Sequence, residues 1–179
     1  MSKFVELSRA TADDSGTITL TGITSDYPVA IAYFTDVVPI DNNADLQYRF
    51  RESSGSDNNN TNYNVVQSNL RTDRSSITAQ YDQLGLSDRD RAFLSGSITN
   101  DANKGMMGYI KIYNASNSSE PTHGLSKSSF MSDGSGINLS QVEGTILREA
   151  STVTGVTFFF DSPSCNIESG DFILYGLKN

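Results

Sequence analysis

Hydrophobic and polar residues alternate one by one along much of this chain, and this alternation limits the possible folds more than any other feature. In residues 46–51, the apolar side chains of Leu46, Tyr48 and Phe50 are separated by polar ones. Because successive side chains of a β-strand point to opposite faces, the pattern predicts a strand with one buried and one solvated side. Comparable alternation is found in residues 4–9, 17–21, 63–70, 77–81 and 106–113.

Three further segments are more continuously apolar. Residues 29–38 and 153–160 are rich in β-branched and aromatic side chains, which favours central strands, and residues 172–177 predict another inner strand. Clusters of Gly, Asn, Asp and Ser separate these segments, as is typical of turns. We therefore predict an all-β protein, an antiparallel β-sandwich of jelly-roll-like form with about nine to eleven strands. We expect its core to contain Leu46, Tyr48, Phe50, Ile110, Ile112, Phe158, Phe160, Phe172 and Leu174.

A helix-like pattern occurs at residues 84–94, where Ser87 is placed to cap a short crossover helix. A chain of 179 residues is long enough to bury one core and short for two, so we expect residues 1–179 to form a single domain.

Charge and targeting signals restrict the possible partners. The chain has 13 Lys plus Arg against 21 Asp plus Glu, a net charge of −8, which repels phosphate backbones and anionic lipid headgroups. We therefore expect neither nucleic acid nor membranes as partners. The single cysteine, Cys165, excludes an internal disulfide, and residues 1–10 contain no apolar run long enough for a signal peptide. We expect synthesis in a cytoplasm.

Catalytic machinery is scarce. With one His and one Cys in the chain, most nucleophile–base pairs and zinc sites have no candidates, and we interpret His123 and Cys165 as structural residues. The sequence leaves open a pair of carboxylates for glycoside hydrolysis, because such a pair is defined by its spacing in the fold. We predict that the chain is not an enzyme, with no catalytic residue, no metal and no cofactor.

One loop has some features of a calcium site. Asp41, Asn43 and Asp45 alternate like the first ligands of a calcium-binding loop, and Glu52 follows at the last position. Leu46 stands where such a loop requires Gly. We therefore expect an ordinary turn, in which Asp and Asn side chains bond their own backbone.

Three segments, in order along the chain, are similar to a known family. The first is Thr-Ile-Thr-Leu-Thr-Gly-Ile-Thr-Ser-Asp-Tyr at 17–27, followed by an Asn-rich loop that ends at Tyr63. The second is Gly-Tyr-Ile-Lys-Ile-Tyr-Asn at 108–114, and the third joins residues 153–158 to the closing strand at 166–178. Together they resemble small structural proteins of marine tailed bacteriophages, including those that infect cyanobacteria.

This resemblance implies a jelly-roll-like sandwich within a virus particle, on the head or on the tail. We predict a capsid decoration, or cement, protein on the outer head surface, because the resemblance covers nearly the whole chain and leaves no shaft or coiled coil. The alternative is a tail-associated fibre or receptor-binding protein that binds carbohydrate. The expected partners are the major capsid protein or tail proteins, and we predict a homo-oligomer with a trimer as the favoured form. A glycan of the host surface is a partner in the alternative, and the expected location is the virion after synthesis in the host cytoplasm.

Two sets of residues are candidates for these contacts. Phe4 and Val5 are apolar and near the start of a predicted strand, so we expect them to contribute to assembly through an exposed strand edge. In the carbohydrate-binding alternative, Asn60, Asn62 and Tyr63 supply amide and phenol groups that hydrogen-bond sugar hydroxyls.

Overall fold

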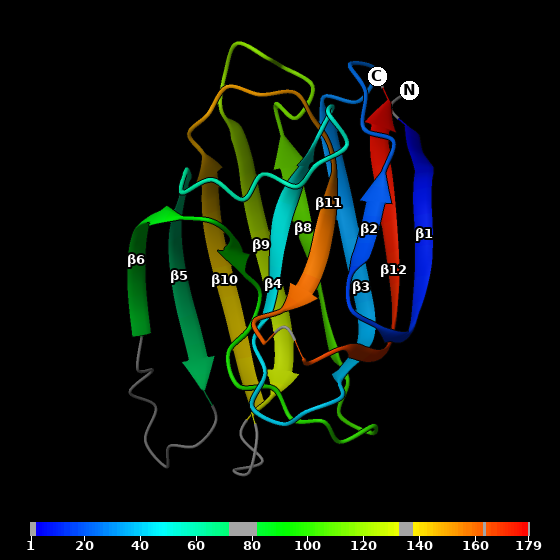
Figure 1. Ribbon diagram of the computed structural model, residues 1–179, viewed down its shortest axis with the longest axis vertical. Helices are drawn as coiled ribbons and strands as arrows, with labels where there is room; N and C mark the ends of the chain where they lie inside the picture. The colour runs from blue at the N-terminus through cyan, green and yellow to red at the C-terminus, as the bar shows by residue number, and fades with distance from the viewer. Residues whose placement is uncertain (1–2, 72–81, 133–137, 163, 179) are drawn as a thin grey trace.

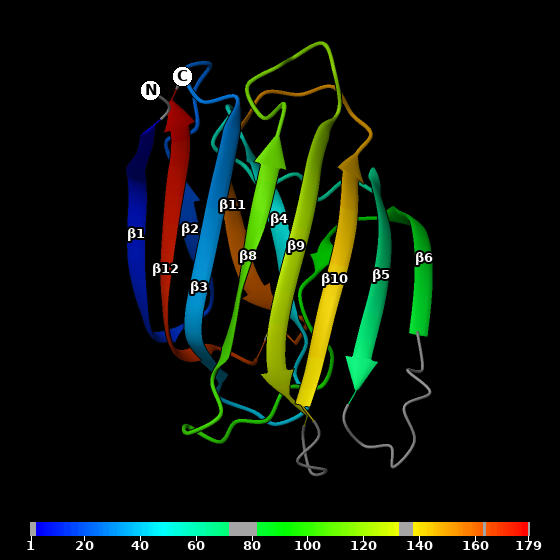
Figure 2. The same cartoon turned by 180° about the vertical axis from the view of Figure 1, so that it is seen from behind.

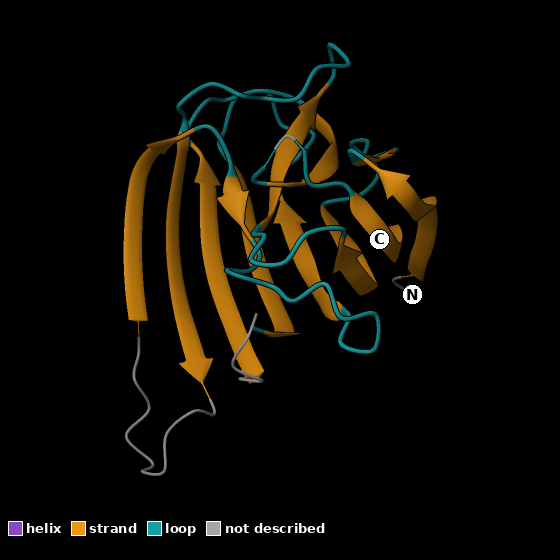
Figure 3. Cartoon of the chain, turned by 60° about the horizontal axis from the view of Figure 1, so that its bottom comes forward, coloured by secondary structure: helices purple, strands orange, loops and turns teal. Residues whose placement is uncertain are grey.

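The computed structural model describes residues 3–71, 82–132, 138–162 and 164–178. Within these residues all regular structure is β-strand, and no helix is present (Figure 3). The strands are β1 (Lys3–Ser15), β2 (Ile18–Thr21), β3 (Val29–Pro39), β4 (Leu46–Glu52), β5 (Tyr63–Arg71), β6 (Asp82–Arg89), β7 (Ala92–Phe93), β8 (Met106–Tyr113), β9 (Thr122–Met131), β10 (Asn138–Leu147), β11 (Val153–Phe160) and β12 (Ile167–Lys178). The strand predicted at 77–81 lies outside the described residues.

The strands form two antiparallel sheets that pack face to face (Figure 1). The large sheet has eight strands in the order β1-β12-β3-β8-β9-β10-β5-β6, and the small sheet has four in the order β2-β11-β4-β7. The predicted antiparallel sandwich is therefore confirmed, with twelve described strands instead of nine to eleven.

The strand order is that of a jelly roll. In the large sheet β1 pairs with β12, which pairs with β3, and β3 pairs with β8. In the small sheet β2 pairs with β11, which pairs with β4, and β4 pairs with β7. Strands far apart in sequence are thus neighbours, as in two interlocked Greek keys. The inserted pairs β5–β6 and β9–β10 widen the large sheet, so that β5 and β6 extend beyond the small one (Figure 1).

The core lies between the sheets. All nine side chains predicted to be inside are buried there. The ring centroid of Phe158 on β11 lies 5.9 Å from that of Phe34 and 5.0 Å from that of Phe172, so aromatic side chains of the two sheets pack against each other. Edge-to-face and tilted aromatic pairs of this kind stabilise a core beyond the area that they bury.

The predicted helix at residues 84–94 is wrong. This segment forms most of β6, which pairs with β5, and then the short strand β7. Asp88 has a φ of 56°, a left-handed conformation that no α-helix contains. Pairing with the sheet has overridden the local pattern, so Ser87 lies in a strand and caps no helix.

Under β9 and β10 the interior is polar. Their inward side chains include Thr122, Ser126, Ser128, Gln141, Glu143 and Thr145, all buried. Some of these side chains hydrogen-bond the backbone at the end of β7. The Ser128 hydroxyl donates to the Leu94 carbonyl at 2.5 Å, and the Gln141 amide donates to the Phe93 carbonyl at 3.3 Å.

Candidate functional site

The outer face of the large sheet, meaning the side turned away from the small sheet, carries many large apolar side chains. Among the described residues, every large exposed hydrophobic side chain except Ile40 lies on this face, contributed by β1, β3, β5, β8, β9 and β10. These side chains are Phe4, Tyr33, Val66, Leu70, Met107, Tyr113, Leu125, Val142 and Ile146. Figure 2 looks onto this face, and no described strand or loop lies in front of it.

Strand β10 shows how unusual the pattern is. Its inward residues Gln141, Glu143 and Thr145 are polar and buried, whereas its outward residues Val142 and Ile146 are 42% and 37% exposed. A sheet with one wet side normally alternates the other way, with hydrophobic residues inside and polar ones outside. An exposed apolar surface made of contiguous residues is typical of an interaction site.

A shallow hollow of about 320 Å³ lies on this face where β5, β9 and β10 meet. Gly144 forms its floor, between Val66 of β5 and Leu125 of β9 in the strand register. A methyl group at Gly144 would meet no atom within 4 Å, so the hollow exists because this position has no side chain. His123 and Ile146 also line it.

Beside the hollow, a tyrosine cluster covers the middle of the sheet. The ring centroid of Tyr33 lies 6.1 Å from that of Tyr109 and 6.0 Å from that of Tyr175. The ammonium of Lys111 lies 5.6 Å from the Tyr109 ring centroid, in a cation–π arrangement. Tyrosine combines a large apolar ring with a hydrogen-bonding hydroxyl and is enriched at protein interfaces.

The charge of this face differs from that of the chain. The whole chain has a net charge of −8, yet the outward positions described on β5, β8, β9 and β10 carry Lys111 and Lys127 and no Asp or Glu. At the β1 margin, Glu6 is neutralised by Arg9, with 2.9 Å between the ion-pair atoms. The centre of the face is therefore apolar, aromatic and weakly basic.

The predicted assembly residues lie at one edge of the large sheet. Phe4 on β1 is 55% exposed and belongs to the outer face, opposite Leu177 of β12. Val5 is half-buried and points to the inner side, opposite Gly176. Among the described strands β1 pairs with β12 alone, so its other edge faces away from the sheet.

The Asn-rich loop is organised around a carboxylate. The side-chain amides of Asn58, Asn60 and Asn62 all donate to Oε2 of Glu149, at 3.2, 3.5 and 2.7 Å. The contacts hold the loop against the end of β10. The structure thus brings the two predicted carbohydrate contacts Asn60 and Asn62 together, with their amides already bonded within the protein.

Tyr63 does not belong to this surface. Its side chain is fully buried, its hydroxyl donates to the Asn58 carbonyl at 3.0 Å, and the Phe50 amide donates to the hydroxyl at 2.9 Å. Burial raises the pKa of its phenol. Tyr63 anchors the loop through this hydrogen bond and exposes no surface to a sugar. It is therefore not a carbohydrate contact.

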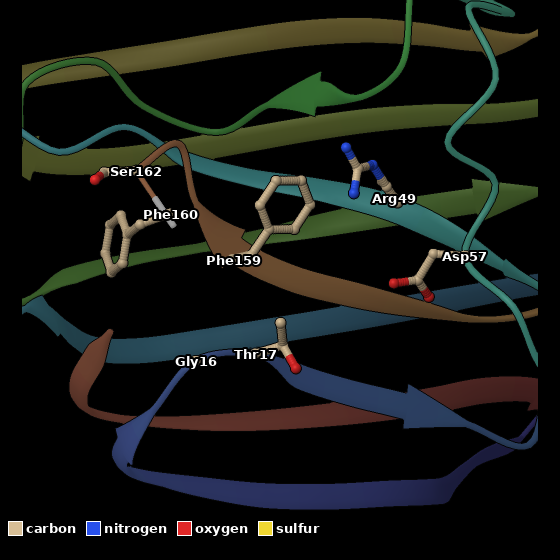
Figure 4. Close-up of a pocket in the computed structure, with 7 residues that line it drawn as sticks. All are labelled: Gly16, Thr17, Arg49, Asp57, Phe159, Phe160 and Ser162. Carbon is tan, nitrogen blue, oxygen red and sulfur yellow. The ribbon is translucent and has the colours of Figure 1, made fainter. Parts of the chain in front are cut away.

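A second, polar surface lies on the outer face of the small sheet. Arg49 of β4 donates to the Asp90 carboxylate at 2.6 Å, and its guanidinium lies 4.7 Å from the ring centroid of Phe159 on β11. Asp57 accepts hydrogen bonds from Arg51 at 3.0 Å and from Thr157 at 2.7 Å. Arg49, Asp57 and Phe159 border a hollow of about 490 Å³, shown in Figure 4.

The other residues considered for catalysis or metal binding do not come together in one site. His123 is exposed on the outer face of the large sheet, whereas Cys165 is buried, and burial raises the pKa of its thiol. No group of three or more His, Cys, Asp or Glu side chains suited to a metal occurs in the described part of the chain. Asp45 of the calcium-like loop instead accepts a hydrogen bond from the Ser97 amide. Within the described residues no helix is long and apolar enough to cross a membrane.

No protein-family model matches the chain, and no curated protein matches its sequence. Two solved structures overlap with it weakly. One, described as the crystal structure of A. japonicus CB05, is 10% identical with a TM-score of 0.35, and the overlap covers 98% of this chain and 26% of that chain. The other, the structure of infectious bursal disease virus Gx strain, is 8% identical with a TM-score of 0.12, covering 100% of this chain and 41% of that one. This chain spans less than half the length of either, and likenesses of this size support no conclusion about function.

Proposed function

We propose that this chain is a non-enzymatic structural protein that docks on a larger protein assembly through the outer face of the large sheet. The observation that carries the proposal is the reversed pattern of β9 and β10, which bury Ser128, Gln141 and Glu143 and expose Leu125, Val142 and Ile146. Exposed apolar side chains gain free energy when a partner covers them, at about 25 cal/mol per Å². The resemblance to phage structural proteins makes the shell of a phage head the proposed assembly, and the chain a decoration protein.

The chemistry of the face indicates what the partner surface offers. The tyrosine cluster favours a flat protein surface with apolar patches and hydrogen-bond acceptors. Lys111 and Lys127 favour acidic groups on the partner, since a like-charged surface would repel them. A second copy docking face to face would bring basic groups together, so a different protein, the major capsid protein, is the proposed occupant.

Self-association would use another part of the molecule. The unpaired edge of β1 extends over thirteen residues and carries the exposed Phe4 near one end. Unpaired strand edges invite pairing with a further strand. We keep the homo-oligomer, with a trimer favoured, as part of the proposal, and mass measurement of the purified protein tests it.

A tail-associated receptor-binding protein is the second candidate. The two candidates differ in their location on the particle and in their copy number, because a decoration protein covers the head in many copies and a tail carries few copies of a receptor-binding protein. Counting the copies of the chain in a particle decides between them. A small number confined to the tail would replace decoration by host recognition.

Two aspartate substitutions test the docking face. Leu125→Asp and Val142→Asp place a charge among exposed apolar side chains and should leave the fold intact while weakening binding to undecorated phage heads by about tenfold or more. Thr21→Asp, at an exposed position of β2 on the small sheet, is the control and should bind normally. Co-sedimentation with the heads measures the effect. Unchanged binding of both large-sheet variants would contradict the docking proposal.

A further inference from the structure

The hollow on the outer face of the small sheet combines three chemical features in one place. Its walls come from segments far apart in sequence: the turn before β2, strand β4, the loop after β4, and the end of β11. In Figure 4, Phe159 projects between Arg49 and Thr17, with Asp57 on the same side of the sheet. At about 490 Å³ the hollow falls within the usual range of small-molecule sites, roughly 300–1,000 Å³.

The polar groups of the hollow are held in place by the protein. Arg49 donates through Nε and Nη2 to the Asp90 carbonyl and carboxylate, at 2.9 and 2.6 Å. Asp57 accepts both of its bonds on Oδ1. Among the contacts of the described residues, none uses Nη1 of Arg49 or Oδ2 of Asp57. One donor and one acceptor in fixed positions therefore remain for a ligand.

The charges of the site cancel. Arg49 is paired with Asp90 and Arg51 with Asp57, at 2.6 and 3.0 Å. An anionic ligand would approach two carboxylates, and a cationic ligand would approach two guanidinium groups. The hollow is thus suited to an uncharged ligand that both donates and accepts hydrogen bonds.

The third feature is an apolar ring surrounded by hydroxyl groups. Phe159 is partly exposed, with the Arg49 guanidinium fixed over its ring. Thr17 and Ser162 border the hollow, and the hydroxyl of Thr157, 3.0 Å from that of Thr19, donates to Asp57 at the border of the hollow. A ligand with an apolar face and several hydroxyls would complement both parts.

We infer that this hollow binds a neutral saccharide, whose C–H face packs on Phe159 and whose hydroxyls bond Arg49 and Asp57. The site includes Asp57 of the Asn-rich loop but not the Asn58 and Asn62 amides, which already bond Glu149. It also lies on the opposite side of the sandwich from the docking face (Figures 1 and 2), so it stays open when that face is covered. The inference does not rest on the proposed function.

The test uses the full chain and a panel of uncharged sugars: glucose, galactose, mannose and N-acetylglucosamine, each with its linear trisaccharide. Ligand-observed NMR at millimolar sugar should detect binding of at least one of them. Phe159→Ala should weaken that binding by about tenfold, because the stacking surface is lost. Phe4→Ala, which removes an exposed Phe from the other sheet, is the matched control and should leave it unchanged.

A second variant separates loss of the site from loss of the fold. Thr17→Trp, at an exposed turn position, should fill the hollow and abolish binding while the circular dichroism spectrum and melting temperature stay those of the parent. Binding of none of the neutral sugars, binding of acidic sugars alone, or equal binding by the parent and Thr17→Trp would overturn the inference. Each of these results would leave the docking test on the large sheet unaffected.

Discussion

Glu143 is a carboxyl group without contact with water. It is fully buried, and it accepts hydrogen bonds from the Thr145 hydroxyl at 2.7 Å and from the Phe93 amide at 3.0 Å. The hydroxyl of Tyr48, which is also buried, interacts with this carboxyl group. Burial disfavours the charged form and raises the pKa of Glu143 to about 8. Near neutral pH the group is therefore mainly protonated.

This pKa predicts how stability depends on pH. As the pH rises from 4.5 to about 8, the unfolded chain loses the Glu143 proton while the folded chain retains it, so the free energy of unfolding falls. This loss of stability should be complete above pH 8, the approximate pKa of Glu143 in the folded protein, and absent below pH 4.5. Glu143→Gln keeps a neutral side chain of the same shape and should remove this part of the decline. Urea denaturation of both proteins at several pH values measures it, and parallel curves would show that Glu143 contributes nothing.

At the scale of the elements, β2 and β11 approach too closely for a side chain at Gly155. A Cβ there would lie 2.0 Å from the Leu20 carbonyl oxygen and 3.0 Å from the Thr21 Cα, both backbone atoms that have little freedom to move. Gly155→Ala should therefore lower the free energy of unfolding by about 1–3 kcal/mol or more. Gly144→Ala, which meets nothing, is the control and should change it by less than about 0.5 kcal/mol. Equal effects in denaturant titrations would show that the close contact relaxes at no cost.

Sequence alternation predicted those elements whose inward residues are apolar. Strands β4 and β8 follow this rule, and the core residues predicted on them are buried. Strands β9 and β10 were not recognised, because many of their inward residues are polar and several of their outward ones are apolar. Alternation alone does not say which set faces the core; that depends on the neighbouring strands, which come from distant parts of the chain.

The candidate sites were harder to predict for the same reason. Tyr63 follows an Asn-rich loop, which suggested exposure, but it shares the inward side of β5 with Val65. The hollow on the small sheet joins Thr17, Arg49 and Phe159, whose proximity follows from β2 and β4 both pairing with β11. No local motif marks such a site, because its residues meet only through the topology.

For the whole molecule, the uneven charge distribution predicts an effect on association. Because the chain is acidic overall while the docking face carries Lys111 and Lys127, these two residues should attract an acidic partner surface. Reversing both to Glu should slow association with phage heads severalfold and make it less sensitive to salt. Lys178→Glu, near the other margin of the sheet, is the control. Stopped-flow or surface-based kinetics at two salt concentrations give the answer, and an unchanged rate would argue against an acidic partner surface.

The position of β12 has a consequence for biosynthesis. It lies between β1 and β3, and β11 likewise lies between β2 and β4, so in each sheet a late segment separates early ones. When a ribosome has synthesised β1 to β4, the strands with which they pair in the two sheets have not yet been made. Closure of the two sheets must wait until β11 and β12 have been made, and pairing over such sequence distances is slow. The nascent chain therefore carries open strand edges until late in synthesis, and a truncation before β12 should yield a chain that aggregates instead of a smaller folded protein.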